Sequence, residues 1–253
     1  DLHKEYRRQR QMCIRDRSLQ YTGKDSKKKL QEIRKELSES GKSDESKPDV
    51  LLLTMLDEIA WLTNMRGSDI EFNPVFEAYA AIFADRAICF CHHPEANLNL
   101  HRPDWEFRPY EDYVSFLADL ALQETIKVWI DPSTITMGSR LAFSENQVFE
   151  KESPIVLSKA LKNSTEITAT KYAHKQAGAG VVRSIQRLQY AFRAGLPVTE
   201  KIYANWLYEE YAKAEDFAGL SFNSIVGSGP NGAIVHYGNP SSCLLYTSPS
   251  PRD

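Results

Sequence analysis

The feature that most constrains the fold is the alternation of amphipathic helices and short apolar strands between residues 25 and 130. Leu30, Ile33 and Leu37 form an apolar stripe at helical spacing, whereas residues 50–54 are an almost continuous apolar run of strand length. Helices and strands that alternate along a chain pack as layers on a sheet. The sequence therefore predicts an α/β (α+β) fold class.

The same reading predicts helices over 25–40, around 59–62 and over 111–122, and strands over 50–54, 76–84, 87–91 and 126–130. A second group of elements follows Ser153-Pro154, with helices over 158–162, 164–194 and 199–214 and strands over 221–225 and 233–237. The glycine-rich loop 227–232 lies between the last two strands, which are expected to form a hairpin.

The helix over 164–194 is predicted to bury one apolar face, formed by Ala177, Val181, Ile185, Leu188 and Phe192. Gly178 and Gly180 lie inside this helix, where each costs about 1 kcal/mol relative to alanine. We therefore expect another element to pack closely against the helix at these two positions.

Both ends of the chain resemble translated sequencing adapter. Residues 243–253 back-translate into a transposase-type adapter, and Met12 to Asp16 back-translate into the reverse complement of the same end. An Arg-rich head can also be a natural arm that binds nucleic acid, but that interpretation leaves the matching tail unexplained. Residues 1–17 and 243–253 are therefore expected to be artefacts that flank a truncated reading frame.

The charge balance excludes a nucleic-acid partner recognised through a basic surface. Residues 18–242 carry 24 Lys or Arg and 30 Asp or Glu side chains, so their net charge is −6. No apolar run approaches the roughly 18 residues that a membrane span needs. We expect a moderately acidic soluble protein that binds neither nucleic acid nor membrane.

Cys89 and Cys91 are the cysteines outside the two end segments, and they lie two residues apart on a predicted strand. Adjacent positions on one strand face are poorly placed for a disulfide, which favours a reducing, cytosolic compartment. His92 and His93 follow directly, and a metal site is a competing interpretation. It is disfavoured because no second Cys/His pair occurs at zinc-finger spacing.

Three further features have ordinary structural interpretations. Trp61, Trp105 and Trp206 are expected to fill cores or interdomain contacts, and the run Lys27-Lys28-Lys29 is expected to be a solvated helix face. The glycines of loop 227–232 do not form a dinucleotide-binding fingerprint, because their spacing is wrong and a strand, not a helix, is expected next.

Three motifs occur in one order along the chain: Leu56 to Leu62, Met65-Arg66-Gly67-Ser68-Asp69, and Gly229 to Tyr237. Together they resemble the long-form aminopeptidase P (Xaa-Pro aminopeptidase) family of the creatinase/prolidase, or pita-bread, metallopeptidases. The resemblance implies a creatinase-N-like middle domain over residues 18–152. It also implies the truncated start of a pita-bread peptidase domain over 153–242.

Members of that family hydrolyse the bond between an N-terminal residue and a penultimate proline with two divalent ions, typically manganese. The resemblance places the metal ligands after the segment around His236, so no residue of this chain is assigned as a metal ligand, and Asp57, Asp69 and Asp131 are not promoted to that role. It also implies peptides with N-terminal Xaa-Pro as substrates, a homodimeric parent and a cytoplasmic location.

His236 is the one active-site residue carried over by the resemblance, in a catalytic and substrate-binding role. The matching histidine of the family helps to stabilise the reacting carbonyl oxygen, a task that needs a donor aimed at developing charge. A histidine that merely caps a hairpin is the alternative.

Two further alternatives concern larger parts of the chain. Arg66 and Asp69 either tie a turn between helix and strand or face a cleft or a neighbouring subunit. The protein as a whole is either a fragment of an Xaa-Pro aminopeptidase, inactive without its metal ligands, or a metal-free pita-bread module that binds peptides. Another hydrolase of the superfamily, such as a prolidase, is a third reading.

Overall fold

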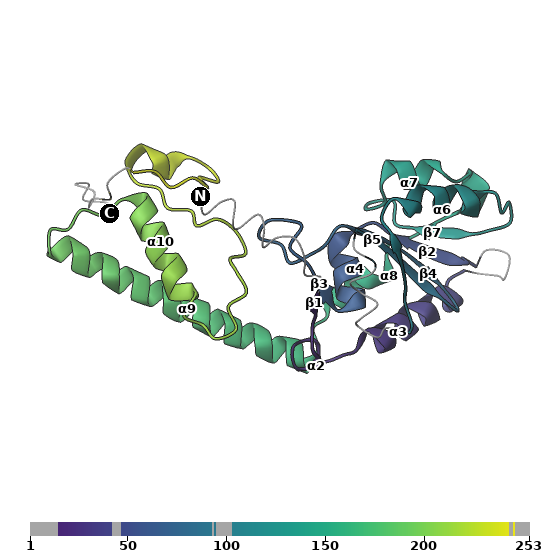
Figure 1. The fold of residues 1–253 in the computed structure, drawn as a ribbon, viewed down its shortest axis with the longest axis horizontal. Coiled ribbons are helices and arrows are strands. Elements are labelled where there is room, and N and C mark those ends of the chain that lie inside the picture. Colours follow the sequence, from purple (N-terminus) through teal and green to yellow (C-terminus); the bar gives the residue numbers. More distant parts are fainter. Residues whose placement is uncertain (1–14, 42–46, 93, 95–102, 243–244, 246–253) are drawn as a thin grey trace. The chain divides into compact units, whose positions relative to one another are not determined.

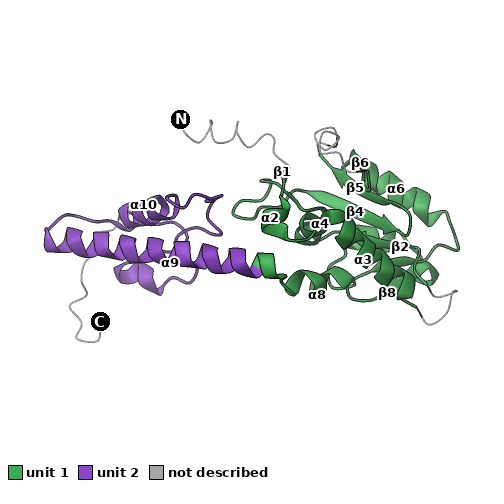
Figure 2. Ribbon diagram, turned by 90° about the horizontal axis from the view of Figure 1, so that it is seen from below, with its two compact units in different colours: residues 1–166 green, residues 167–253 purple. Residues whose placement is uncertain are grey.

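The computed structural model describes residues 15–41, 47–92, 94, 103–242 and 245. They form two compact units, which we call unit 1 (residues 1–166) and unit 2 (residues 167–253) (Figure 2). No helix within the described ranges is both long enough and apolar enough to cross a membrane.

Unit 1 is built on a six-stranded mixed sheet with the order β6-β5-β4-β2-β7-β8. Its central strand β2 pairs antiparallel with β4 and parallel with β7. A separate short pair joins β1 to β3. The strands are β1 (Arg15–Asp16), β2 (Val50–Leu53), β3 (Met65–Arg66), β4 (Ala78–Phe83), β5 (Ala87–Cys91), β6 (Glu106–Pro109), β7 (Val128–Ile130) and β8 (Val148–Glu150).

Helices cover both faces of this sheet, as Figure 1 shows, with α6 and α7 on one side and α3, α4 and α8 on the other. A short 3₁₀ turn, η2 (Glu145–Gln147), precedes β8. The helices of unit 1 are α2 (Leu19–Thr22), α3 (Ser26–Glu39), α4 (Leu56–Thr63), α6 (Asp112–Ala121), α7 (Met137–Leu141) and α8 (Pro154–Ala160). The predicted α/β class is confirmed.

The core of unit 1 is divided by the sheet into two apolar clusters. Leu51 and Leu53 of β2 face the cluster of α3 and α4, whereas Val50 and Leu52 face the cluster of α6. Successive side chains of a strand point to opposite faces, so a strand covered on both faces must be apolar throughout. This explains the continuous apolar run that predicted β2.

The predicted short helix over 158–162 is wrong in its position, because α8 begins four residues earlier. The Ser153 hydroxyl accepts a hydrogen bond from the backbone N–H of Ile155 (3.3 Å), and Pro154 occupies the first helical position. A capping serine followed by proline is a strong helix start. Ile155, which is fully buried, anchors the helix in the cluster of α3 and α4.

Unit 2 contains most of the 30-residue helix α9 (Ser164–Arg193), followed by α10 (Glu200–Tyr211) and the 3₁₀ turn η3 (Gly229–Ala233). Thr199 caps α10 at the start of the helix predicted over 199–214, since its hydroxyl accepts a hydrogen bond from the backbone N–H of Ile202 (3.2 Å). Gly195 ends the long helical segment with a left-handed backbone (φ +65°).

The predicted strands over 221–225 and 233–237 are wrong. The described residues of both segments are irregular, and η3 occupies the place of the expected hairpin turn. Pro230 lacks the N–H that a ladder needs and fits the start of a helical turn. A strand also needs a backbone partner, and the described part of unit 2 offers none.

The predicted buried face of α9 is also wrong. The buried residues are Gly180, Ser184 and Ala191, whereas Val181 and Ile185 are exposed. Small side chains allow α10 to approach α9 closely, and a Cβ placed on Gly180 would lie 2.9 Å from the Tyr211 ring. The expected close approach therefore exists at Gly180, whereas no heavy atom would lie within 4 Å of a Cβ on Gly178.

These two glycines provide a matched pair of substitutions. Gly178→Ala is expected to raise the free energy of unfolding of unit 2 by up to about 1 kcal/mol, since alanine is the better helix former. Gly180→Ala is expected to give no gain or a loss, because the Tyr211 ring must move. Urea unfolding of both variants measures the difference, and an equal gain for both would contradict the close contact.

Candidate functional site

The segment that carries His236 is organised around one buried carboxylate, that of Glu200 at the start of α10. Five donors converge on its two oxygens, and all five come from residues 228–241. They are the backbone N–H of Ser228 (2.6 Å), the amide of Asn231 (3.1 Å), the hydroxyl of Tyr237 (2.8 Å), and the backbone N–H (2.9 Å) and hydroxyl (2.8 Å) of Ser241.

This environment favours the ionised form of Glu200. Burial of the carboxyl group by itself raises its pKa, but the hydrogen bonds from Ser241, Asn231 and Tyr237 outweigh burial and lower the pKa from 4.5 to about 2. A carboxylate in the first turn is also stabilised by the helix N-terminus. Glu200 is therefore a charged anchor for the loop at neutral pH.

His236 lies between the anchored residues Asn231 and Ser241 and next to Tyr237. Its side chain is exposed, and its backbone is left-handed (φ 57°), a conformation that non-glycine residues adopt mainly in turns. The imidazole is therefore presented to solvent from a turn instead of from the predicted strand. Its catalytic and substrate-binding role stays a prediction.

An apolar pocket of about 550 Å³ lies in unit 2 between α9, α10 and the segment 214–225. Aromatic rings from all three parts line it, among them Tyr172, Tyr211, Phe217 and Phe222. His236 is not among the lining residues. The structure thus does not bring the predicted histidine and this apolar pocket together.

The Cys89 to His92 segment is not a metal site. Both cysteines are fully buried in the core and form no disulfide, and the His92 ring instead pairs with Glu77 (3.0 Å) and stacks on Tyr110 (centroids 4.4 Å apart). His93 and His101 lie outside the described residues. Among the residues that are described, no group of three or more His, Cys, Asp or Glu could hold a metal ion.

Asp57, Asp69 and Asp131 bind backbone and side-chain groups of unit 1. Asp131 accepts hydrogen bonds from the backbone N–H groups of Ser133 (2.9 Å) and Ser153 (2.8 Å), and Asp57 pairs with Lys159. Asp69 accepts from the backbone N–H of Glu77 (2.8 Å). The residues present therefore do not fit a two-metal centre, and no metal-dependent step is assigned to them.

The Met65 to Asp69 motif has a clear structural purpose. The Arg66 guanidinium donates to the carbonyl of Ala60 in α4 (2.6 Å), and Asp69 holds the segment before β4. A Cβ on Gly67 would lie 2.6 Å from the Cβ of Phe76, so only glycine fits there. These contacts match the interpretation of a tied turn between helix and strand.

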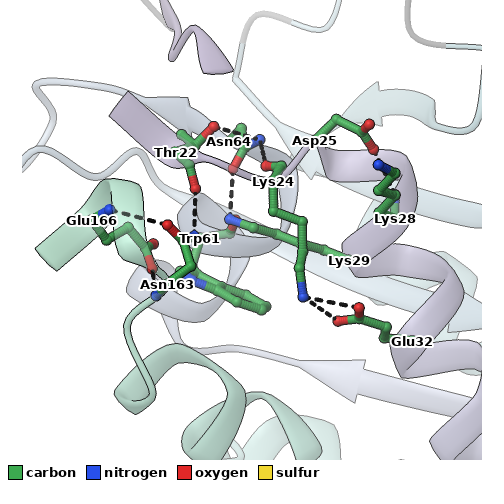
Figure 3. A network of polar contacts seen from close by, with 10 residues as sticks. All are labelled: Thr22, Lys24, Asp25, Lys28, Lys29, Glu32, Trp61, Asn64, Asn163 and Glu166. Carbon is green, nitrogen blue, oxygen red and sulfur yellow. Dashed lines mark hydrogen bonds and ion pairs between the residues drawn. The ribbon is translucent and has the colours of Figure 1, made fainter. Parts of the chain in front are cut away.

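A second polar network surrounds Lys29 in unit 1 (Figure 3). The ammonium donates to the Trp61 carbonyl (2.8 Å) and the Asn64 side chain (2.7 Å), and it lies 4.1 Å from the centre of the Trp61 ring. Asn64 in turn donates to the Lys24 carbonyl (2.9 Å). The network joins α3 to the C-terminal end of α4, where orphan carbonyls need donors.

The predicted solvated face Lys27-Lys28-Lys29 is therefore wrong for its third member. Lys27 and Lys28 are exposed, but Lys29 is only 2% exposed. Burial lowers the pKa of Lys29 from 10.5 to about 8. Lys29 lies one turn before Ile33 and so continues the buried stripe of α3.

The start of α9 is tied to the same region. Asn163 and Glu166 exchange hydrogen bonds between side chain and backbone (2.9 and 3.0 Å), which caps the helix reciprocally. The Asn163 amide also donates to the Thr22 carbonyl (2.8 Å) at the end of α2 (Figure 3). Residues 163–166 thus belong physically to unit 1.

Two sequence profiles match this chain in succession. That of the Creatinase/Prolidase N-terminal domain matches residues 7–166. The chain belongs to this family. The profile of metallopeptidase family M24 matches residues 171–248. Each match overlaps a segment for which adapter origin is predicted, and that origin, like the domain boundary at 152/153, stays a prediction.

Curated relatives of this Creatinase/Prolidase chain include a probable Xaa-Pro aminopeptidase P from Coprinopsis cinerea. It is 33% identical over 243 residues, which are 89% of this chain and 38% of the relative. A protein of the same name from Laccaria bicolor is 34% identical and covers 90% of this chain and 35% of its own length. The chain therefore spans little more than a third of each relative.

Solved structures share the fold. X-prolyl aminopeptidase from Caenorhabditis elegans, described as a cytosolic enzyme with a di-nuclear active site, matches with a TM-score of 0.75 at 22% identity, covering 88% of this chain and 37% of that one. The N-terminal domain of a FACT complex subunit from chickpea matches with a TM-score of 0.52 at 13% identity, covering 93% of this chain and 62% of that one.

Sequence reasoning missed the two residues that organise the polar networks. Glu200 follows the helix cap Thr199, an ordinary place for a carboxylate, and its partners lie up to 41 residues away. Lys29 lies in a run of three lysines. Its helical spacing from Ile33 and Leu37, which places all three on one face of the helix, was the one available signal of its burial.

Proposed function

We propose that this chain is part of a long-form Xaa-Pro aminopeptidase, which removes the N-terminal residue from peptides with penultimate proline. The supporting observation is the succession of two matched families, a Creatinase/Prolidase N-terminal domain and metallopeptidase M24, in a chain 33% identical to a probable Xaa-Pro aminopeptidase P. In the complete protein, two divalent ions, manganese by preference, activate the attacking water.

Within this assignment His236 faces the substrate and donates to the reacting carbonyl oxygen. Its exposure, and the anchoring of the loop on both sides of it, support that role. A donor that acts on developing charge must be held in place before the reaction.

The proposal includes that this chain is a fragment and is inactive alone. The match covers only 38% of the length of the Coprinopsis cinerea relative, and the described residues hold no cluster of metal ligands. A cytosolic location agrees with two buried cysteines that form no disulfide and with the cytosolic description of the Caenorhabditis elegans enzyme. The parent is proposed to be a homodimer.

An assay of the full chain with an Xaa-Pro peptide, with and without manganese, is expected to show no hydrolysis, since the metal centre is incomplete. The complete gene product, read beyond codon 242, is expected to cleave the same peptide only with metal. Metal-dependent cleavage by the present chain would contradict the fragment assignment. A complete product that is inactive in both conditions would contradict the aminopeptidase assignment.

A metal-free peptide-binding module is the second candidate, and the likeness to the chickpea FACT subunit domain favours it. The sequence beyond residue 242 distinguishes the two. Two Asp, then one His and two Glu, favour the enzyme, whereas apolar or basic residues at those places favour the binding module. A prolidase is a third candidate within the enzyme class.

A further inference from the structure

The loop that carries His236 begins and ends at the same carboxylate. Ser228 and Ser241 lie thirteen positions apart, yet the backbone N–H of each donates to Glu200. Asn231 and Tyr237 attach the interior of the loop to the same group, and Asn231 also bonds to the Tyr237 hydroxyl (3.2 Å). Asn231 before His236 and Tyr237 after it are therefore both attached to Glu200.

Glu200 is fully buried in the first turn of α10, and the backbone N–H of its neighbour Lys201 donates to the Ser241 carbonyl (3.1 Å). The carboxylate has no ion pair with a cationic side chain among the described residues, and five uncharged donors stabilise its negative charge through hydrogen bonds. An ionised carboxylate has about four acceptor sites and no donor. It can therefore accept hydrogen bonds from several converging donors at once.

We propose that Glu200 is a positioning residue, which holds the loop 228–241 in one conformation and thereby fixes the direction of the His236 imidazole. The assignment of a substrate-facing role to His236 rests on the proposed function. The anchoring of the loop does not, since it follows from the contacts of Glu200 alone.

The decisive substitution is Glu200→Gln, compared with Glu209→Gln in the full chain. Glutamine keeps the shape of Glu200 but places an NH₂ donor against the donors of the loop. Glu209 lies on the same helix and forms a half-exposed pair with Arg187 (2.6 Å), so its substitution is the matched control. Exposed pairs of this kind contribute little.

The first readout is the hydrogen exchange of the Ile234 amide. This amide donates to the Asn231 carbonyl (3.2 Å) and does not touch Glu200, so it reports the order of the loop. Glu200→Gln is expected to accelerate its exchange at least tenfold, with α9 amides unchanged, whereas Glu209→Gln leaves it unchanged. Equal exchange in both variants would overturn the proposal.

The second readout is the NMR signal of the His236 ring, assigned by its loss in His236→Gln. One sharp set of signals is expected in the wild type, and broadened or multiple sets in Glu200→Gln. Glu200→Asp retains the charge and is expected to restore a single set in part. Should Glu200→Gln fail to fold, Tyr237→Phe removes one donor beside His236 and is expected to broaden the same signal; an unchanged signal there would overturn the proposal.

A failure of the proposed function would give a different result from a failure of the Glu200 proposal. Addition of an Xaa-Pro peptide is expected to shift the His236 signal if this histidine faces the substrate. If the peptide shifts no histidine signal while Glu200→Gln still disorders the loop, the assignment of Glu200 stands and the substrate-facing role of His236 does not.

Discussion

Trp129→Ala is expected to lower the free energy of unfolding of unit 1 by about 3–5 kcal/mol. Trp129 is among the largest fully buried side chains and lies in β7, next to the central strand. Its indole N–H donates to the Lys151 carbonyl (2.9 Å), and its ring packs edge-on against Phe149 (centroids 5.7 Å apart). Alanine leaves a cavity and removes the hydrogen bond to the Lys151 carbonyl.

The matched control for this prediction is Trp206→Ala. Trp206 is half-buried on α10, where the Arg187 guanidinium lies 4.3 Å from the centre of its ring, a contact of about 1 kcal/mol. Urea unfolding followed by far-UV circular dichroism, with hydrogen exchange of β2 amides to identify unit 1, measures both variants. Equal and small losses would show that the sheet core does not depend on Trp129. A loss of 3–5 kcal/mol is a large part of the 5–15 kcal/mol that stabilises a typical domain.

The stability of unit 1 is expected to rise between about pH 8 and pH 10.5 because of Lys29. Burial lowers the folded-state pKa of Lys29 to about 8, whereas its ordinary value is 10.5. Between these values the unfolded chain binds more protons than the folded one, so the free energy of unfolding increases with pH. Below pH 8 the cost of burying the charge is fully present; the full change amounts to roughly 3 kcal/mol.

Comparison with Lys29→Met isolates this effect. Other groups also make the stability depend on pH near the top of this range, including Tyr110, whose pKa is raised from 10.0 to about 12 on folding by a hydrogen bond with Tyr79 and by burial. These groups are common to both proteins and cancel in the difference. The wild type is expected to gain stability relative to Lys29→Met as pH rises from 8 to 10.5. A constant difference across that range would mean that Lys29 carries no shifted pKa.

The central strands and main helices of unit 1 were predictable from local pattern. Two local patterns predicted burial correctly: the helical spacing of Leu30, Ile33 and Leu37, and the almost continuous apolar run over 50–54. The strands β6 and β8 were missed. Both lie at the edges of the sheet, where a strand is short and partly exposed, so neither carries the apolar signature of a central strand.

Unit 2 was less predictable because its long helix buries small residues and leaves larger apolar residues exposed. In α9 the small residues Gly180, Ser184 and Ala191 are buried, and the first two contact α10 through Tyr211 and Tyr203, while Val181 and Ile185 remain exposed. Apolar periodicity marks which residues prefer burial, but close approach of two helices is decided by which residues leave room. The strands predicted around His236 needed backbone partners, which no local pattern supplies.

The sequence by itself determined the layered α/β architecture of unit 1 and the motifs of the Creatinase/Prolidase family, because periodicity and motif order are properties of neighbouring residues. The tertiary structure alone decided that Lys29 is buried against Trp61 and that Glu200 gathers the loop around His236. A polar contact has no periodicity, and its partners lie 32 and 41 residues away in these two cases. Such contacts exist only after the chain has brought distant segments together.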